Sequence, residues 1–357
     1  MRHLTYLTLA LTLAAPLGGQ QPDRYTLDGD FVAIYNLAGQ LQVEAGQGDV
    51  AVQITRGGAD GARLTVAQGE IGGRPSLRVI YPADRIRYAV GKGDGRTQLR
   101  VRDDGTFGDG AEWEHDRGRD RHQDGRRVTI GTDSGGLDAH ADLTVQIPPG
   151  RRVALFLAVG RVTVTNVSGD LRIDASSSAV TATGFTGSLS IDVGSGTVQA
   201  TGIDGDLSVD TGSGPVEVSQ VKGKRVSIDT GSGDVTGSDL QGDELAIDTG
   251  SGEIRLTGLR SPRISLETGS GRVTADVRAD IRSLEVETGS GNIAITAPPT
   301  LGAEVEIETS SGDIETDFPM QVTRHGRDHM TGRIGDGQGS IAIETGSGEV
   351  RLLKGSN

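Results

Sequence analysis

The sequence contains no cysteine, so it can form neither a disulfide nor a cysteine-linked lipid anchor, and it has no thiol nucleophile. Tryptophan occurs once, at Trp113, and aromatic residues make up only 3% of the 357 residues. A globular enzyme of this length normally buries more aromatic bulk. The composition is instead typical of a thin core that Val, Ile, Leu and Thr can fill.

Long apolar runs are also lacking. The longest, residues 4–15, is shorter than the roughly 18 apolar residues that a membrane-spanning helix needs, so we expect no transmembrane segment. Arg2 and His3 precede this run and small residues follow it, which predicts a secretory signal over residues 1–20. The alternative is a buried N-terminal strand. With a signal, the chain is exported to the periplasm, the cell envelope or the extracellular space.

Basic residues are outnumbered: 35 Lys and Arg face 49 Asp and Glu, which gives a formal net charge of −14. Nucleic acid and anionic lipid carry negative charge of their own and attract basic proteins. The balance therefore argues against nucleic acid and anionic lipid as partners.

Glycine is abundant, with 56 residues, and much of it lies in one repeated turn. A Gly-Ser-Gly sequence begins at Gly194, Gly212, Gly231, Gly250, Gly269, Gly289 and Gly346, and a degenerate copy is Ser310-Ser311-Gly312. Most copies are 18–21 residues apart. A fixed period in this range indicates a repeat architecture.

Each repeat contains two short strands. Leu207 and Val209 alternate with polar residues before the turn, as do Val216 and Val218 after it, so each strand has one apolar and one polar face. Two strands cannot bury a core alone, but stacked copies can, because each coil pairs its backbone with its neighbours. We therefore predict an all-β fold, a parallel β-solenoid of about ten coils.

The remaining chain divides by composition. Residues 21–81 contain imperfect strand patterns and are predicted to form an irregular N-terminal β cap. Residues 82–136 are rich in charge and glycine, and we expect a flexible insert, with a recognition loop anchored by Trp113 as the alternative. Residues 137–357 hold the solenoid repeats, interrupted by a loop at 318–339.

The repeated turn resembles a known family. Asp210-Thr-Gly-Ser-Gly-Pro-Val and Asp229-Thr-Gly-Ser-Gly-Asp-Val are similar to turns of the bacterial putative adhesin domain of unknown function. The resemblance implies an exported or envelope-associated β-solenoid. It supplies no catalytic residue and no cofactor to transfer to this chain.

An acidic residue recurs two positions before each turn. This set, the acidic column, comprises Asp174, Asp192, Asp210, Asp229, Asp248, Glu267, Glu287, Glu308 and Glu344. Neighbouring carboxylates one strand apart repel each other, so something must offset the repulsion. One interpretation is that each carboxylate accepts backbone N–H bonds from the turns. The other is a ladder of weak Ca²⁺ sites, with Asp192, Asp210, Asp229, Asp248, Glu267 and Glu287 as candidate ligands.

Two functional classes fit these features. The leading hypothesis is a non-enzymatic, adhesin-like scaffold that presents a repetitive Ser, Thr and Asp face to an envelope protein or a glycan surface. The alternative is a carbohydrate-active enzyme, a lyase or hydrolase built on a parallel β-helix. Such an enzyme needs a walled cleft, which only residues 82–136 and 318–339 are long enough to supply. The oligomeric state stays open.

Overall fold

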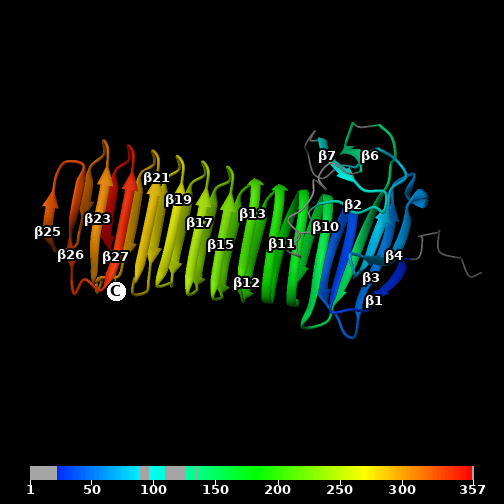
Figure 1. Ribbon diagram of the computed structural model, residues 1–357, viewed down its shortest axis with the longest axis horizontal. Helices are drawn as coiled ribbons and strands as arrows, with labels where there is room; N and C mark the ends of the chain where they lie inside the picture. The colour runs from blue at the N-terminus through cyan, green and yellow to red at the C-terminus, as the bar shows by residue number, and fades with distance from the viewer. Residues whose placement is uncertain (1–21, 89–95, 109–124, 134, 356–357) are drawn as a thin grey trace, which may run out of the picture.

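The computed structural model describes residues 22–88, 96–108, 125–133 and 135–355. Over these ranges the protein is almost entirely β: one 25-stranded sheet, a separate three-stranded sheet, and a short 3₁₀ helix, η1 (Gly61–Arg63). The strands lie side by side along one long axis (Figure 1). The expected signal over residues 1–20 lies outside the described residues. None of the helices in the described ranges has the length and apolar character needed to cross a membrane.

The stack has two layers of mostly parallel strands, joined at corners. The first layer contains β13 (Leu207–Ser213), β15 (Arg225–Thr230), β17 (Glu244–Thr249), β19 (Arg263–Thr268), β21 (Ser283–Thr288), β27 (Gly339–Thr345) and β23 (Ala303–Thr309). The second contains β12 (Val198–Asp204), β14 (Val216–Lys222), β16 (Val235–Gln241), β18 (Ile254–Leu259), β20 (Val273–Val277), β22 (Ile293–Ala297), β28 (Val350–Lys354) and β24 (Ile314–Thr316). One strand from each layer forms a rung.

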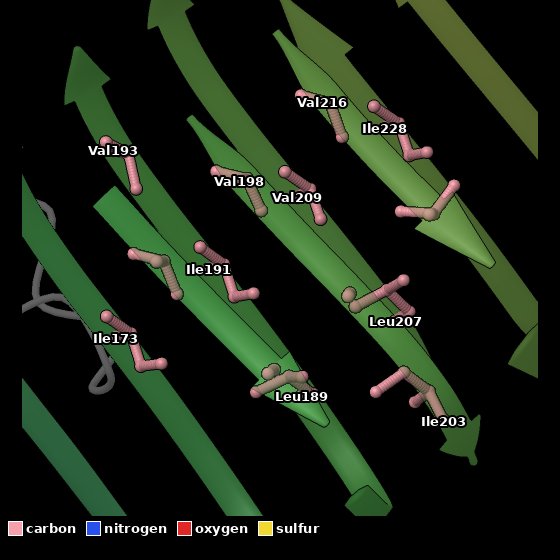
Figure 2. Close-up of a cluster of buried hydrophobic side chains, with 14 of the residues drawn as sticks. Ile173, Leu189, Ile191, Val193, Val198, Ile203, Leu207, Val209, Val216 and Ile228 are labelled. Carbon is pink, nitrogen blue, oxygen red and sulfur yellow. The ribbon is translucent and has the colours of Figure 1, made fainter. Parts of the chain in front are cut away.

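Alternation within each strand builds the core. Leu189 pairs with Leu207, which pairs in turn with Val226, so like residues stack on like residues from rung to rung. The apolar side chains point between the two layers and form continuous rows, as Figure 2 shows for Ile191, Val209 and their neighbours. Because each rung is thin, aliphatic side chains fill it, which accounts for the scarcity of aromatic residues.

The first rung is the single strand β2 (Phe31–Ala45), which passes through both layers and pairs in parallel with β10 (Arg151–Thr165). Its bend lies at a buried polar cluster: the Asn36 amide donates to the carbonyls of Ala38 and Ala141, and the Tyr81 hydroxyl donates to the side-chain oxygen of Asn36. Residues 31–45 are therefore part of the stack, whereas we had predicted an irregular cap over all of 21–81.

The cap itself comes from residues on both sides of this rung. In the second layer β2 is followed by β9 (His140–Ile147), β3 (Val50–Gly57) and β1 (Asp23–Leu27), the last two antiparallel to their neighbours. In the first layer it is followed by β5 (Arg74–Ile80) and the antiparallel β4 (Thr65–Ile71). A long strand, β11 (Ser168–Ser195), leads from β10 into the regular rungs.

The charged insert contains ordered strands. β6 (Arg85–Arg87), β7 (Arg96–Val101) and β8 (Arg126–Gly131) form the three-stranded sheet at the N-terminal end of the rod (Figure 1). Val101, Val128 and Ile130 are buried. The expectation of a flexible insert is thus wrong for these strands, because alternating apolar residues flank the charged segment. Trp113 lies outside the described residues.

The C-terminal rungs do not follow the order of the sequence. The rung that is last in the sequence consists of β27 and β28. It lies inside the stack and pairs with β21 and β22 on one side and with β23 and β24 on the other. The chain therefore leaves β22, skips one position, builds the outer rung, and returns to fill the gap. In the acidic column, Glu344 consequently lies between Glu287 and Glu308.

The predicted loop at 318–339 is largely a β-hairpin. β26 (His329–Ile334) adds antiparallel to β23, and β25 (Met320–His325) adds to β26 with a bulge at Thr323. Met330 and Ile334 of β26 are buried, so the hairpin extends the apolar core at the C-terminal end.

Candidate binding face

From Gly231 onward, the threonine before each Gly-Ser-Gly corner accepts the N–H of the second glycine of that corner. Thr249 is completely buried, its Oγ1 donates to the carbonyl of Gly233 in the preceding rung at 3.0 Å, and it accepts the N–H of Gly252 at 3.0 Å. Thr268, Thr288, Thr345 and Thr309 repeat both bonds. The hydroxyls thus form a ladder that locks one corner onto the next. A threonine precedes every one of these turns except the first, where Val193 stands. We had counted threonine as part of the presented polar face, but these threonine side chains are buried.

The glycines of these corners are required by close stacking. A Cβ on Gly233 would overlap the carbonyl oxygen of Gly214, and one on Gly252 would overlap that of Gly233. Neither residue has a positive φ. We had attributed the glycines to turn conformation, which holds for Gly214, where φ is 151°. From Gly233 onward, the constraint is the approach of neighbouring rungs.

The acidic column forms one continuous row on the outer surface of the first layer. Asp192, Asp210, Asp229, Asp248, Glu267, Glu287, Glu344 and Glu308 pair in this order across adjacent strands. All except the half-buried Asp192 are exposed. Adjacent strands are about 4.8 Å apart, so carboxylates of one charge recur at that spacing.

Partial burial and mutual repulsion raise the pKa values of carboxyl groups in the column. Burial and the charge of Asp229 raise the pKa of Asp210 and of Asp248. The charge of Asp248, followed by partial burial and the charge of Glu287, raises the pKa of Glu267. The column therefore opposes folding at neutral pH and would be stabilised by a cation that neutralised it.

Backbone N–H bonds to carboxylates exist, but in other positions. The Asp206 carboxylate accepts the N–H groups of Lys224 and Arg225 at 2.9 and 3.0 Å, and that of Asp234 accepts the N–H of Glu253 at 2.9 Å. Over the described ranges, the side chains of Asp210, Asp229 and Asp248 make no such bond. Hydrogen bonds from the turns therefore do not offset the repulsion there.

Aromatic residues end the column on its N-terminal side. Asp174 pairs with Phe156, and Phe156 pairs with Tyr35, so the row changes from carboxylates to rings. Tyr35 and Phe156 stack with 4.3 Å between centroids, and Phe107 of the insert packs edge-on against both. Gly108, which follows Phe107, is also close to the column: a Cβ on it would lie 2.9 Å from Oδ2 of Asp174. The insert thus covers this end of the column.

The two long segments that could wall a catalytic cleft lie far apart. The sheet of the insert is at the N-terminal end of the rod and the β25–β26 hairpin is at the C-terminal end (Figure 1). A cavity of about 440 Å³ is lined in part by Asp280, Arg282 and Asp336. It lies where the chain passes the position that β27 and β28 later fill. It is separate from the acidic column. In the described part of the chain, no three His, Asp or Glu side chains are grouped so as to hold a metal ion.

Comparison with known proteins places the chain in a family. The model of the Toastrack DUF4097 family matches residues 122–353, which is more than half of the chain. The chain belongs to the Toastrack DUF4097 family. The match spans the regular rungs and the C-terminal hairpin of this Toastrack protein, but not β2 or the strands β3–β7.

Among solved structures, one similar chain is described as a putative cell adhesion protein from Clostridium sporogenes ATCC 15579. It is 8% identical, and the alignment covers 94% of this chain and 100% of that one with a TM-score of 0.18, which is too low to support an argument. A search of curated proteins finds no match.

Replacing Thr249 by valine should lower the free energy of unfolding by about 1–3 kcal/mol, because the buried N–H of Gly252 loses its acceptor. The matched control is Thr211→Val. Thr211 is equally buried, but within the described residues its Oγ1 has no hydrogen-bond partner. Urea denaturation of both variants should show a loss for Thr249→Val only. Equal losses would contradict the role of the hydroxyl ladder.

Replacing Asp229 by asparagine should raise the melting temperature at pH 7, since this charge raises the pKa of both Asp210 and Asp248. A carboxyl with a raised pKa favours the folded state while protonated and disfavours it as the pH rises through that pKa. The gain should therefore shrink as the pH falls toward 3.8, the ordinary Asp value. Thermal unfolding between pH 3.5 and 7 measures it, with Asp243→Asn, outside the column, as the control. A gain independent of pH would rule out this explanation.

Proposed function

We propose that the protein is an exported, non-enzymatic, adhesin-like scaffold of the bacterial cell envelope. Its repetitive face of exposed Ser, Asp and Glu side chains would bind an envelope protein or a glycan surface. The observation that carries the proposal is the acidic column: exposed carboxylates of successive rungs lie in register along one flat outer surface. Residues 1–20, with their signal-like pattern, support export.

Repetition gives such a surface its binding strength. A partner with groups at the same spacing engages several equivalent sites, and each contact raises the effective concentration of the next. The same proposal includes about ten coils with a period of 18–21 residues. The strand register supports it, since Leu189, Leu207 and Val226 stack in successive rungs. A rigid rod of this kind keeps the sites aligned.

No specific observation favours the alternative function, that of a carbohydrate-active enzyme. Its cleft would require residues 82–136 and 318–339 to meet over shared carboxylates, and the described parts of the two segments lie at opposite ends of the rod (Figure 1). We therefore propose no catalytic residue and no enzyme cofactor.

The test compares two triple variants with the same change of charge. Asp210→Asn/Asp229→Asn/Asp248→Asn removes three adjacent carboxylates from the column, whereas Asp204→Asn/Asp239→Asn/Asp276→Asn removes three elsewhere. In pull-downs from envelope fractions and on glycan arrays, the column variant should bind at least tenfold more weakly than the wild type, because multivalent contacts are lost together. The control should bind normally. Equal binding by all three proteins, or no binding by the wild type, would contradict the proposal.

We further propose that the column binds Ca²⁺ weakly through carboxylate oxygens. Millimolar Ca²⁺ should then raise the melting temperature of the wild type, and EDTA should reverse the shift, because ligand binding to the folded state stabilises it. The column variant should show a smaller shift than the control variant. Equal shifts, or no shift in the wild type, would exclude the Ca²⁺ ladder.

A further inference from the structure

The corners opposite the Gly-Ser-Gly turns lead from a second-layer strand into a first-layer strand, and most of them are short. Residues 205–206 join β12 to β13, and residues 242–243 join β16 to β17. Residues 278–282, between β20 and β21, and residues 298–302, between β22 and β23, are longer. Together with residues 335–338, between β26 and β27, they surround the cavity of about 440 Å³, which we call the corner cavity.

Backbone hydrogen bonds join the segments around the corner cavity. The N–H of Arg282 donates to the carbonyl of Pro262 at 2.8 Å, and the carbonyl of Arg282 accepts the N–H of Ser340 at 3.0 Å. The N–H of Gly339 donates to the carbonyl of Gly302 at 2.9 Å. The walls are therefore preorganised, so a ligand could bind without the entropic cost of ordering a loop.

The corner cavity has an apolar part and a polar part. Ile281 and Leu301 are buried, and the half-buried Pro262 and Pro298 extend the apolar surface. The polar part is formed by exposed residues, namely Asp280, Arg282, Asp336 and Gln338. Because its polar wall is exposed, the cavity opens to solvent and can admit one unit of a longer chain. Its volume also falls within the roughly 300–1,000 Å³ that is usual for small-molecule sites.

The charged side chains of the cavity retain hydrogen-bonding capacity for a ligand. Within the described residues, neither Asp280 nor Arg282 forms an ion pair or a side-chain hydrogen bond. Asp336 is held in place, since its Oδ1 accepts the N–H of Gln338 at 3.2 Å and lies so close to Gly302 that a Cβ there would overlap it. Its other carboxylate oxygen remains available to a ligand.

This combination of groups matches a sugar. Charges of both signs line the cavity, so a ligand with a net charge of either sign meets a like charge. Carboxylate and guanidinium groups each offer two hydrogen-bonding atoms side by side and form charge-assisted bonds with hydroxyl groups. A sugar ring carries hydroxyls at its edge and C–H groups on its faces. We propose that the corner cavity binds a neutral sugar unit of a polysaccharide.

A zwitterion, such as a short peptide, is the competing ligand. Its ammonium and carboxylate groups could pair with Asp280 and Arg282, but the Asp336 carboxylate would then have no counter-charge. Sugar hydroxyls can donate to both carboxylates and accept from the guanidinium. The polar wall therefore favours the sugar.

The experiment measures binding of the full-length protein to three fluorescent neutral hexasaccharides: maltohexaose, cellohexaose and N-acetylchitohexaose. Asp280→Ala and Arg282→Ala should each weaken binding of at least one sugar by fivefold or more, because each removes charge-assisted hydrogen bonds. The matched controls are Asp243→Ala and Arg272→Ala. Both side chains are exposed, lie outside the corner cavity and form no ion pair with any described residue. Raising the salt concentration should leave the affinity unchanged, because the ligand is uncharged.

Equal losses in Asp280→Ala and Asp243→Ala would overturn the corner cavity as the site. Tighter binding of triglycine than of every sugar would overturn the sugar assignment, and so would a strong loss of affinity at high salt. Absence of wild-type binding to all three sugars at millimolar concentration would overturn the proposal as a whole.

The corner cavity is separate from the acidic column, so this proposal goes beyond the proposed function and can fail independently of it. The column variant should bind the hexasaccharides as the wild type does, and a loss of sugar binding in it would contradict the cavity as the site. Asp280→Ala and Arg282→Ala should in turn leave binding to envelope fractions through the column unchanged.

Discussion

The structure depends on the parallel backbone pairing of each rung with the next. Because this pairing is in register, a residue type that suits one rung is repeated at the same position in neighbouring rungs. Such residues therefore form a row along the rod. The buried valines and leucines, the threonine hydroxyls and the outer carboxylates are all such rows. The first two stabilise the stack. The third opposes it, since like charges are held one strand apart.

Both ends of the stack are closed in the same way, by antiparallel strands from a segment that leaves the stack and returns to it. At the N-terminal end, residues 46–150 leave the first rung, build β3–β9, and return to the second rung at β10. At the C-terminal end, residues 298–338 leave β22, build the outer rung and the β25–β26 hairpin, and return to β27. In each case antiparallel strands terminate the parallel sheet. At the C-terminal end, the edge strand β24 has three residues and the edge strand β25 is bulged, which limits pairing with other chains there.

Much of the fold could be predicted from the sequence because the determining signal is local and repeated. The alternation of Leu207 and Val209 identifies a strand, and the recurrence of the turn identifies the stacking partner. The acidic column followed directly from that register. The position of Glu344 could not be predicted in this way. The sequence of β27 resembles that of the other strands in the first layer, so it does not indicate that β27 lies between β21 and β23.

The contacts of Phe31 were missed for a related reason. Arg74 and Arg152 are far apart in the sequence and belong to no repeat, and only the pairing of β5 and β10 with β2 brings both to its ring. The threonine ladder was visible as a pattern, but its meaning required distances. A hydroxyl before a glycine turn has several uses, and only the contact between Thr249 and Gly233 shows that it joins two rungs.

The position of β27 and β28 inside the stack affects the order in which the rungs can assemble during synthesis. During synthesis from the N-terminus, β23 and β24 emerge before β27 and β28, yet those two strands provide their only parallel partners. The outer rung and its hairpin therefore join the growing rod only after β27 and β28 have been made. A nascent chain stopped near residue 338 would lack the strands that connect its outer rung to β21 and β22.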